Sequence, residues 1–153
     1  MHIRLADVLS KGTARRARPV SKAASCDVRE DDVEEVFVEK VDAFKHKECR
    51  LVSKNGREVG VFRLGDEYFA WHNTCAHQGG PVCQGRIFPR VIQSLGEDQT
   101  TAGTVYSEEE IHIVCPWHGY EYNIRTGRNA GHPRLRLRPA PIVIRDGAVY
   151  VQL

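Results

Sequence analysis

The chain lacks any long hydrophobic run. No stretch of its 153 residues approaches the roughly 20 consecutive apolar residues that a membrane-spanning helix needs, and the N-terminus has no apolar core of the signal-peptide kind. The pair Arg15-Arg16 is followed by residues 17–22, which offer no apolar run for a twin-arginine export signal. We therefore expect a cytoplasmic protein with no membrane span.

The sequence also lacks an excess of charge of either sign. It has 22 Lys and Arg against 20 Asp and Glu, for a formal net charge of +2. Domains that bind nucleic acid usually carry a strong basic patch, so this balance indicates no nucleic-acid partner. With 41% hydrophobic and 27% charged residues, the chain has the composition of one ordinary globular domain.

Cysteine is scarce, and its spacing shows no CxxC pair. The five cysteines are an odd number. In a chain without an export signal, they are better explained as metal ligands and free thiols than as a disulfide framework. We expect Cys26 to be a thiol of the N-terminal tail, Cys49 a strand residue and Cys83 a free buried thiol.

Residues 1–33 differ in character from the rest. They contain basic and small residues, then the acidic group Glu30-Asp31-Asp32, and residues 11–25 show no sustained apolar period. We predict an extended and partly flexible N-terminal arm, in which residues 3–9 could form a short helix. A solvated arm is favoured over a docking segment for an acidic partner.

The remainder, residues 34–153, has the rhythm of an all-β domain. Short runs rich in Val, Ile, Phe and Tyr predict strands at residues 36–40, 49–54, 57–64, 67–71, 141–145 and 148–152. Asn55-Gly56 and Asp146-Gly147 are two-residue hairpin signals, and Gly65-Asp66 provides a further turn.

Two segments that each follow a predicted strand contain both cysteine and histidine. The first reads Cys75-Ala76-His77-Gln78-Gly79-Gly80-Pro81, and the second reads Cys115-Pro116-Trp117-His118-Gly119. Each box supplies one thiolate and one imidazole. Glycines after the histidines let the backbone approach a bound group and leave N–H groups free, and Pro81 and Pro116 stiffen the loops.

These boxes resemble those of Rieske ferredoxins and of the Rieske domains of ring-hydroxylating oxygenases. The resemblance runs over about residues 36–151 and includes Tyr68-Phe69-Ala70, Tyr120-Glu121-Tyr122 and Thr126-Gly127. It implies a Rieske iron-sulfur fold, an antiparallel β sandwich or barrel with a small cluster-binding subdomain. It also implies one 2Fe-2S cluster whose two irons are held by the two cysteines and by the two histidines, namely Cys75, Cys115, His77 and His118.

The same resemblance suggests the surroundings of the cluster. Respiratory-chain Rieske proteins have an extra disulfide and a serine near the cluster, but this chain has Gly80, Trp117 and Tyr120 at the matching positions. Tyr122 matches the family's hydrogen-bonding tyrosine, and Trp117 is expected to exclude water. Fewer donors to the sulfurs predict a potential near the low end of the range of about −150 to +300 mV.

The spacing of the boxes departs from the family, because 37 residues separate His77 from Cys115. We assign the excess to an inserted excursion at residues 86–110, which could form a hairpin. Since loop closure costs grow only logarithmically with length, the insertion leaves the cluster prediction intact. It could cover the site, contact a partner or mediate self-association, although a tolerated surface elaboration is favoured.

A closed zinc site is the main alternative for the four ligands, since it also takes two thiolates and two imidazoles. The Cys-x-His and Cys-x-x-His-Gly pattern in a β-rich chain favours iron and sulfur.

The expected function is one-electron transfer rather than catalysis. Too few residues remain for a second domain with a mononuclear iron held by two histidines and a carboxylate. We expect a ferredoxin that passes electrons from a flavin-dependent reductase to a terminal oxygenase, with His77 and His118 as the exit. The alternatives are a small subunit held permanently in a larger oxidoreductase complex, and a redox- or metal-responsive binding module.

Overall fold

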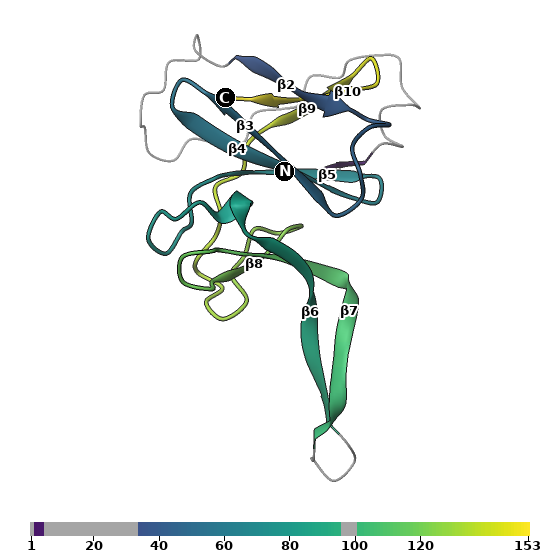
Figure 1. Cartoon of the computed structure of the whole chain (residues 1–153), viewed down its shortest axis with the longest axis vertical. Coiled ribbons are helices and arrows are strands. Elements are labelled where there is room, and N and C mark those ends of the chain that lie inside the picture. The colour runs from purple at the N-terminus through teal and green to yellow at the C-terminus, as the bar shows by residue number, and fades with distance from the viewer. Residues whose placement is uncertain (1, 5–33, 96–100) are drawn as a thin grey trace, which may run out of the picture.

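Antiparallel strands make up almost all of the fold in the computed structural model, which describes residues 2–4, 34–95 and 101–153 (Figure 1). The strands form three sheets with the orders β1-β5-β4-β3, β2-β10-β9 and β6-β7-β8. Their bounds are β1 (His2–Arg4), β2 (Glu35–Lys40), β3 (Glu48–Lys54), β4 (Arg57–Leu64), β5 (Glu67–His72), β6 (Arg86–Leu95), β7 (Thr101–Val114), β8 (Glu121–Asn123), β9 (Ile142–Arg145) and β10 (Ala148–Gln152). Among the described residues the one helical element is a 3₁₀ turn, Val82–Gln84.

The predicted hairpins are confirmed. Asn55 and Gly56 join β3 to β4 with φ of 51° and 74°. Asp146 and Gly147 join β9 to β10 with φ of 52° and 70°. Positive φ at both turn positions gives a turn whose twist matches that of the flanking strands.

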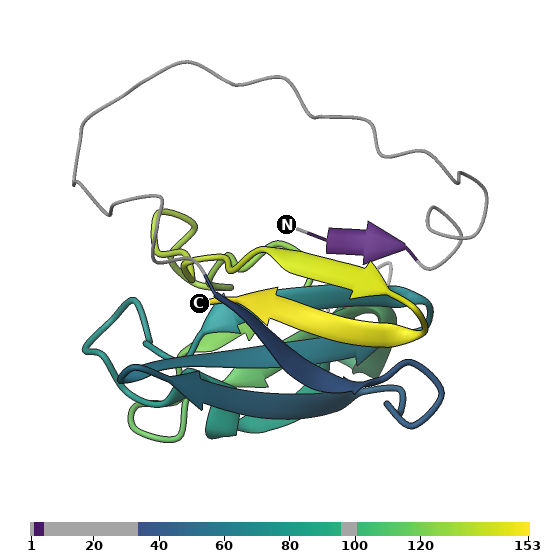
Figure 2. The same cartoon turned by 90° about the horizontal axis from the view of Figure 1, so that it is seen from above.

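The central sheet is buried on both faces, which explains its nearly continuous apolar sequence. In β4 and β5 the residues alternate between two cores. One face packs against the sheet of β2, β10 and β9, which lies across it in Figure 2. That first core is formed by residues of both sheets: Val59, Val61, Tyr68, Ala70, Ile142, Val149 and Val151.

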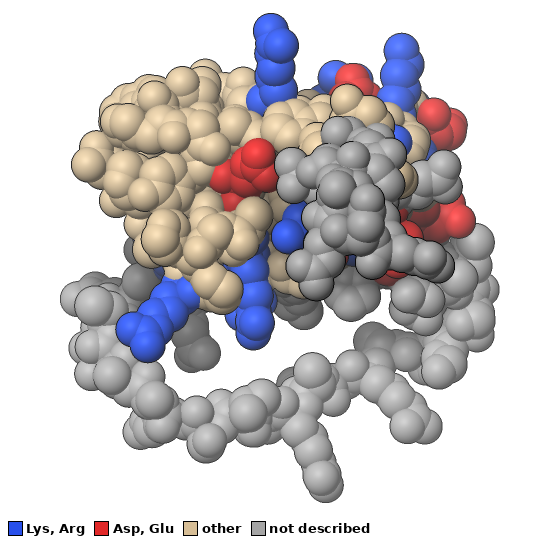
Figure 3. All heavy atoms as spheres, turned by 90° about the horizontal axis from the view of Figure 1, so that it is seen from below, with Lys and Arg blue, Asp and Glu red and all other residues tan. Residues whose placement is uncertain are grey.

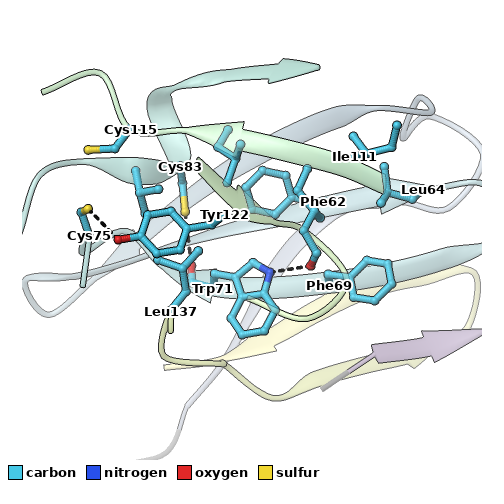
Figure 4. Packing of buried hydrophobic residues seen from close by; sticks show 13 residues of the cluster. Phe62, Leu64, Phe69, Trp71, Cys75, Cys83, Ile111, Cys115, Tyr122 and Leu137 are labelled. Atoms are coloured by element: carbon cyan, nitrogen blue, oxygen red, sulfur yellow. Dashed lines mark hydrogen bonds between the residues drawn. The ribbon is translucent and has the colours of Figure 1, made fainter. Parts of the chain in front are cut away.

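The opposite face of the central sheet packs against β7 and β8, as Figure 4 shows. This second core includes Phe62, Trp71, Ile113 and Tyr122, each with no more than 1% of its surface exposed. Trp71 Nε1 donates a hydrogen bond of 2.9 Å to the carbonyl oxygen of Ile124, which follows β8. The third sheet is therefore joined to the body through a core that also contains the candidate ligands Cys75 and Cys115.

The segment between the boxes is a long hairpin of β6 and β7 that projects away from the body (Figure 1). At its foot, residues 86–89 of β6 pair with residues 111–114 of β7. The register then shifts between the pair Pro89–Ile111 and the next pair, Val91–Tyr106. Between these two pairs β7 has several more residues than β6. The part of the chain that leaves the body thus begins near Val91.

The short helix that residues 3–9 could have formed is absent where the structure describes this segment, at residues 3 and 4. His2–Arg4 form a strand that pairs antiparallel with residues 67–69 of β5, because the edge of β5 offers backbone hydrogen bonds to a neighbour. Residues 5–33, and with them Cys26 and most of the predicted arm, lie outside the described residues. In the part of the chain that the structure describes, no helix is long and apolar enough to cross a membrane.

We predict that Gly127→Ala destabilises the protein because the new Cβ would lie 2.6 Å from the buried indole of Trp71, at a φ of +70°. Gly147 is a matched control, since it has the same φ but no atom within 4 Å of an added Cβ. Overpacking should cost about 2 kcal/mol beyond the backbone strain that both variants share. The thermal midpoint of Gly127→Ala should then lie about 4 to 8 °C below that of Gly147→Ala. Equal thermal midpoints for the two variants would contradict the claim that Trp71 leaves no room for a side chain at position 127.

Candidate metal centre

The two boxes form loops of matching geometry at the ends of β5 and β7. In the first loop the N–H of Gly79 donates to the carbonyl oxygen of Cys75 at 2.9 Å, and in the second the N–H of Gly119 donates to that of Cys115 at 3.0 Å. Both glycines have positive φ, 74° and 70°, which residues with a Cβ rarely adopt. Each loop thus folds back on its cysteine and presents the histidine between the two anchored residues.

The two candidate thiols lie next to each other at the edge of the second core. Cys75 is 4% exposed and Cys115 is 1% exposed. Burial and the neighbouring Cys75 raise the pKa of the Cys115 thiol, whereas the backbone amides of Trp117 and His118 lower it by hydrogen bonding to its sulfur. These amides already point at a sulfur, so they are placed to stabilise a thiolate.

Tyr122 contacts the other thiol. Its hydroxyl lies 3.2 Å from Cys75 Sγ, and both groups are buried (Figure 4). Burial first, and then the contact with Cys75, raise the pKa of Tyr122 above its ordinary value. The hydroxyl therefore keeps its proton near neutral pH and can donate a hydrogen bond to the sulfur.

The two candidate imidazoles also form a pair. The ring centroids of His77 and His118 are 5.1 Å apart, and the rings are perpendicular. The Nδ1 atom of His77 is buried without a hydrogen-bond partner, which is costly for a ring nitrogen unless it binds something. His118, in contrast, is exposed.

This division into a thiol pair and an imidazole pair matches the donor set of a two-iron cluster. In such a cluster two thiolates bind one iron and two imidazoles bind the other.

Gly80 and Trp117, one from each loop, are in direct contact. A Cβ added to Gly80 would lie 2.9 Å from atoms of the Trp117 indole and 3.1 Å from Cys115 Sγ. Trp117 is nevertheless 60% exposed, so the indole lies over Gly80 and faces solvent on its other side. The positions expected from the resemblance to match a disulfide are thus joined here by packing.

Tyr120 stacks on His77. The ring centroids are 4.0 Å apart and the rings are within 10° of parallel. Beyond Tyr120 lies the exposed ring of His132, with a centroid distance of 6.2 Å. His77 therefore has one face covered, and its plane is fixed by an aromatic neighbour, whereas His118 has Trp117 at 6.3 Å and remains open to solvent.

The other residues predicted to surround the cluster lie on the same two loops. Pro81 precedes the 3₁₀ turn, and Pro116 is exposed beside Trp117. Cys83 is free and buried as predicted, and burial raises its pKa to about 12. Its thiol donates to the carbonyl oxygen of Trp71 at 3.4 Å, so it supports the first loop from inside.

Sequence reasoning missed one anchor of the first loop, Asn73. Its side chain accepts the N–H of Cys83 at 2.8 Å and donates to the Glu58 carboxylate at 2.9 Å. Asn73 is 6% exposed, and it links the start of the loop to Cys83 in the 3₁₀ turn that follows the box. An asparagine directly after a strand is common in turns, so nothing in the sequence distinguished this one.

The two loops themselves contain no formally charged side chain. Residues 73–85 and 115–120 contain no Lys, Arg, Asp or Glu. Viewed from the end of the molecule to which the hairpin projects, Figure 3 shows a broad area without charged side chains. Trp117 and His118 are the exposed aromatic groups of these loops.

Comparison with known proteins gives a match to the family model of the Rieske [2Fe-2S] domain over residues 34–141. Among curated proteins, the chain is 28% identical over 114 residues to the anthranilate 1,2-dioxygenase ferredoxin subunit of Burkholderia cepacia, a match that covers 74% of this chain and 86% of that protein. It is 27% identical over 94 residues to ferredoxin CarAc of Metapseudomonas resinovorans, covering 61% of this chain and 68% of that one.

Solved structures agree on the fold. The ferredoxin of carbazole 1,9a-dioxygenase from Nocardioides aromaticivorans IC177 superposes with a TM-score of 0.52 at 24% identity, covering 76% of this chain and 95% of that one. A structure described as a nitrite reductase small subunit from Mycobacterium tuberculosis gives a TM-score of 0.57 at 16% identity, covering 79% and 96%.

We predict that Tyr122→Phe lowers the reduction potential of the protein. A hydrogen bond donated to a sulfur stabilises the more negative, reduced state, and its differential strength of about 1 kcal/mol corresponds to roughly 40 mV for one electron. Tyr106→Phe, which changes an exposed tyrosine of the hairpin, should leave the potential unchanged. Spectroscopic redox titration measures both. A Tyr122→Phe potential equal to that of the wild type would rule out this donor role.

We also predict that Gly80→Ala weakens the centre, because its Cβ would strike the Trp117 indole. The rate at which the visible absorbance is lost on heating should rise several-fold, as expected for about 1 to 2 kcal/mol of overpacking. The double variant Gly80→Ala with Trp117→Ala should lose part of this defect, although a contact of 3.1 Å with Cys115 Sγ would remain. Strictly additive effects of the two substitutions would show that the residues act independently.

Proposed function

Because the chain belongs to the Rieske [2Fe-2S] domain family, we propose that Cys75 and Cys115 hold one iron of a 2Fe-2S cluster and that His77 and His118 hold the other. The arrangement of the described residues supports this assignment, since the two thiols are neighbours and the two imidazole rings are neighbours. The Nδ1 atom of His77, which is buried without a hydrogen-bond partner, also supports the assignment of His77 as a ligand. This pairing of like donors is the observation that carries the proposal.

The function that follows is that of a one-electron carrier. When bound, the cluster supplies reversible uptake of a single electron. The protein accepts that electron from a flavin-dependent reductase and delivers it to a terminal oxygenase. Support comes from two relatives that bear the names of ferredoxin components. It also comes from a similar solved structure, a complex of reduced oxygenase and oxidized ferredoxin in carbazole 1,9a-dioxygenase.

The chain's own residues would perform three tasks in this function. The buried core around Cys75 and Cys115 excludes water from the sulfur side. Tyr122 and the amides of the second loop direct hydrogen bonds at the sulfurs. On the other side, the exposed ring of His118 offers an edge to a docking partner, and the uncharged loops around it suit a small interface that forms and dissociates repeatedly.

The location and the partnership are parts of the same proposal. We propose a cytoplasmic protein, in keeping with the free thiols of Cys49 and Cys83, the two described cysteines that are not proposed as ligands. A permanent place in a larger oxidoreductase is the second candidate, favoured by the likeness to a nitrite reductase small subunit. Gel filtration of the native protein from its source would separate the two, because a permanent subunit elutes with its complex.

The proposal is tested on protein purified anaerobically without added metal. We expect two irons and two acid-labile sulfides per chain, a rhombic electron paramagnetic resonance signal with a low average g-value after reduction, and a negative midpoint potential. Cys115→Ser should lose iron, sulfide and signal, whereas Cys83→Ser, the matched buried thiol, should keep all three. A colourless protein that binds one zinc ion would overturn the cluster assignment.

Electron delivery is tested with the same protein. The reduced protein should be formed by NADH and a flavin-dependent reductase of an aromatic-ring dioxygenase system, and it should be reoxidised by the matching oxygenase component. An intact cluster that neither accepts nor delivers electrons in this assay would leave the cluster in place and reject the carrier role in such systems.

A further inference from the structure

The outer part of the β6–β7 hairpin is a two-stranded ribbon with open edges. This ribbon comprises residues 91–95 and 101–106, and its strands pair only with each other among the described elements. β8 pairs with β7 only at His112, Ile113 and Val114, which lie at the foot of the hairpin. Isolated two-stranded ribbons are at best marginally stable in water, so a third surface is needed to stabilise this one.

Apolar side chains are exposed on both faces of the ribbon. Val91 and Tyr106 are cross-strand partners on one face, with 49% and 63% of their surfaces exposed. Val105 is 54% exposed, and as the neighbour of Tyr106 along β7 it points to the opposite face. These three make up half of the six large hydrophobic residues that are exposed in the described chain.

Two of the usual protections of a sheet edge, charged residues and proline, are missing from the strands of the ribbon, although the pairing has one register shift between Ser94 and Leu95. Exposed edges are normally blunted by charged residues, by proline or by a covering element. Residues 91–95 and 101–106 contain no Lys, Arg, Asp, Glu or Pro. The nearest described ion pair, Arg90 with Glu110 at 2.7 Å, lies next to the ribbon in the chain, between the ribbon and the foot of the hairpin.

We infer that the ribbon is a self-association surface on which two copies of this chain pair. Two identical strand edges related by a two-fold axis run antiparallel, so each can complete the hydrogen bonds of the other. An uncharged surface can face its own copy without repulsion, whereas a strongly basic or acidic one could not. The absence of charge therefore favours a second copy as the occupant.

A redox partner is a poorer candidate for this surface. A carrier that shuttles between a reductase and an oxygenase is free for part of each cycle, and during that time the ribbon would be uncovered. A second copy can cover it throughout. The inference goes beyond the proposed function, since pairing of the ribbons requires neither the cluster nor a redox partner.

The test is sedimentation equilibrium of the full-length holoprotein from low to high micromolar concentration. We expect the wild type to approach twice the mass of one chain. Val105→Lys and Tyr106→Lys should each weaken the dimer by at least about tenfold, because like charges would meet across the two-fold axis. Leu51→Lys, which changes an exposed residue of β3 in the body, is the matched control and should leave the dimer intact.

The visible and paramagnetic resonance spectra should be the same in all these variants, which shows that they fold and load the cluster. A wild type that remains monomeric at high micromolar concentration would overturn the inference, whether or not a redox partner binds. A dimer that persists in both ribbon variants would also overturn it, by placing the interface elsewhere. Loss of electron transfer in a variant that still dimerises would bear on the proposed function alone.

Discussion

The candidate centre depends on the way Trp71 joins two sheets. Its strand leads directly into the first cysteine box, and its indole donates a hydrogen bond to Ile124, in the segment that follows the second box. Gly127 lies against the indole so closely that no side chain fits between them. One buried aromatic residue thus holds together the chain segments that precede one loop and follow the other. Rigid spacing of the two loops would matter for holding a 2Fe-2S cluster, because each loop would supply one cysteine and one histidine to it.

Between the loops themselves, contact is made by shape rather than by a covalent bond. The absence of a side chain on Gly80 leaves room for the indole of Trp117, and the two loops approach closely enough for the thiols of Cys75 and Cys115 to be neighbours. A packed contact can yield slightly when a charge changes at the site, which a disulfide cannot do without strain. A packed contact, unlike a disulfide, also does not depend on the redox state of its surroundings.

Much of the fold was predictable because its signals are local. Asn55-Gly56 and Asp146-Gly147 specify tight turns by themselves, and the donor types of the two boxes specify the family. The helix considered at residues 3–9 failed because a strand edge in β5, far away in sequence, pairs with His2–Arg4. The stacking of Tyr120 on His77 and the hydrogen bond between Asn73 and Cys83 could not be predicted from the sequence either, since each depends on how the folded segments pack. The sequence could place an insertion between the boxes and suggest a hairpin there, as the structure has it, but the register of its strands could not be predicted.

The lack of formal charge on the loop surface has a kinetic consequence. Electrostatic steering accelerates encounters between oppositely charged proteins and makes their association rates fall steeply as salt is added. A partner approaching residues 73–85 and 115–120 meets no such field from these loops. These loops therefore add no electrostatic steering of their own, and at the point of contact they offer a partner the fit of an indole and an imidazole.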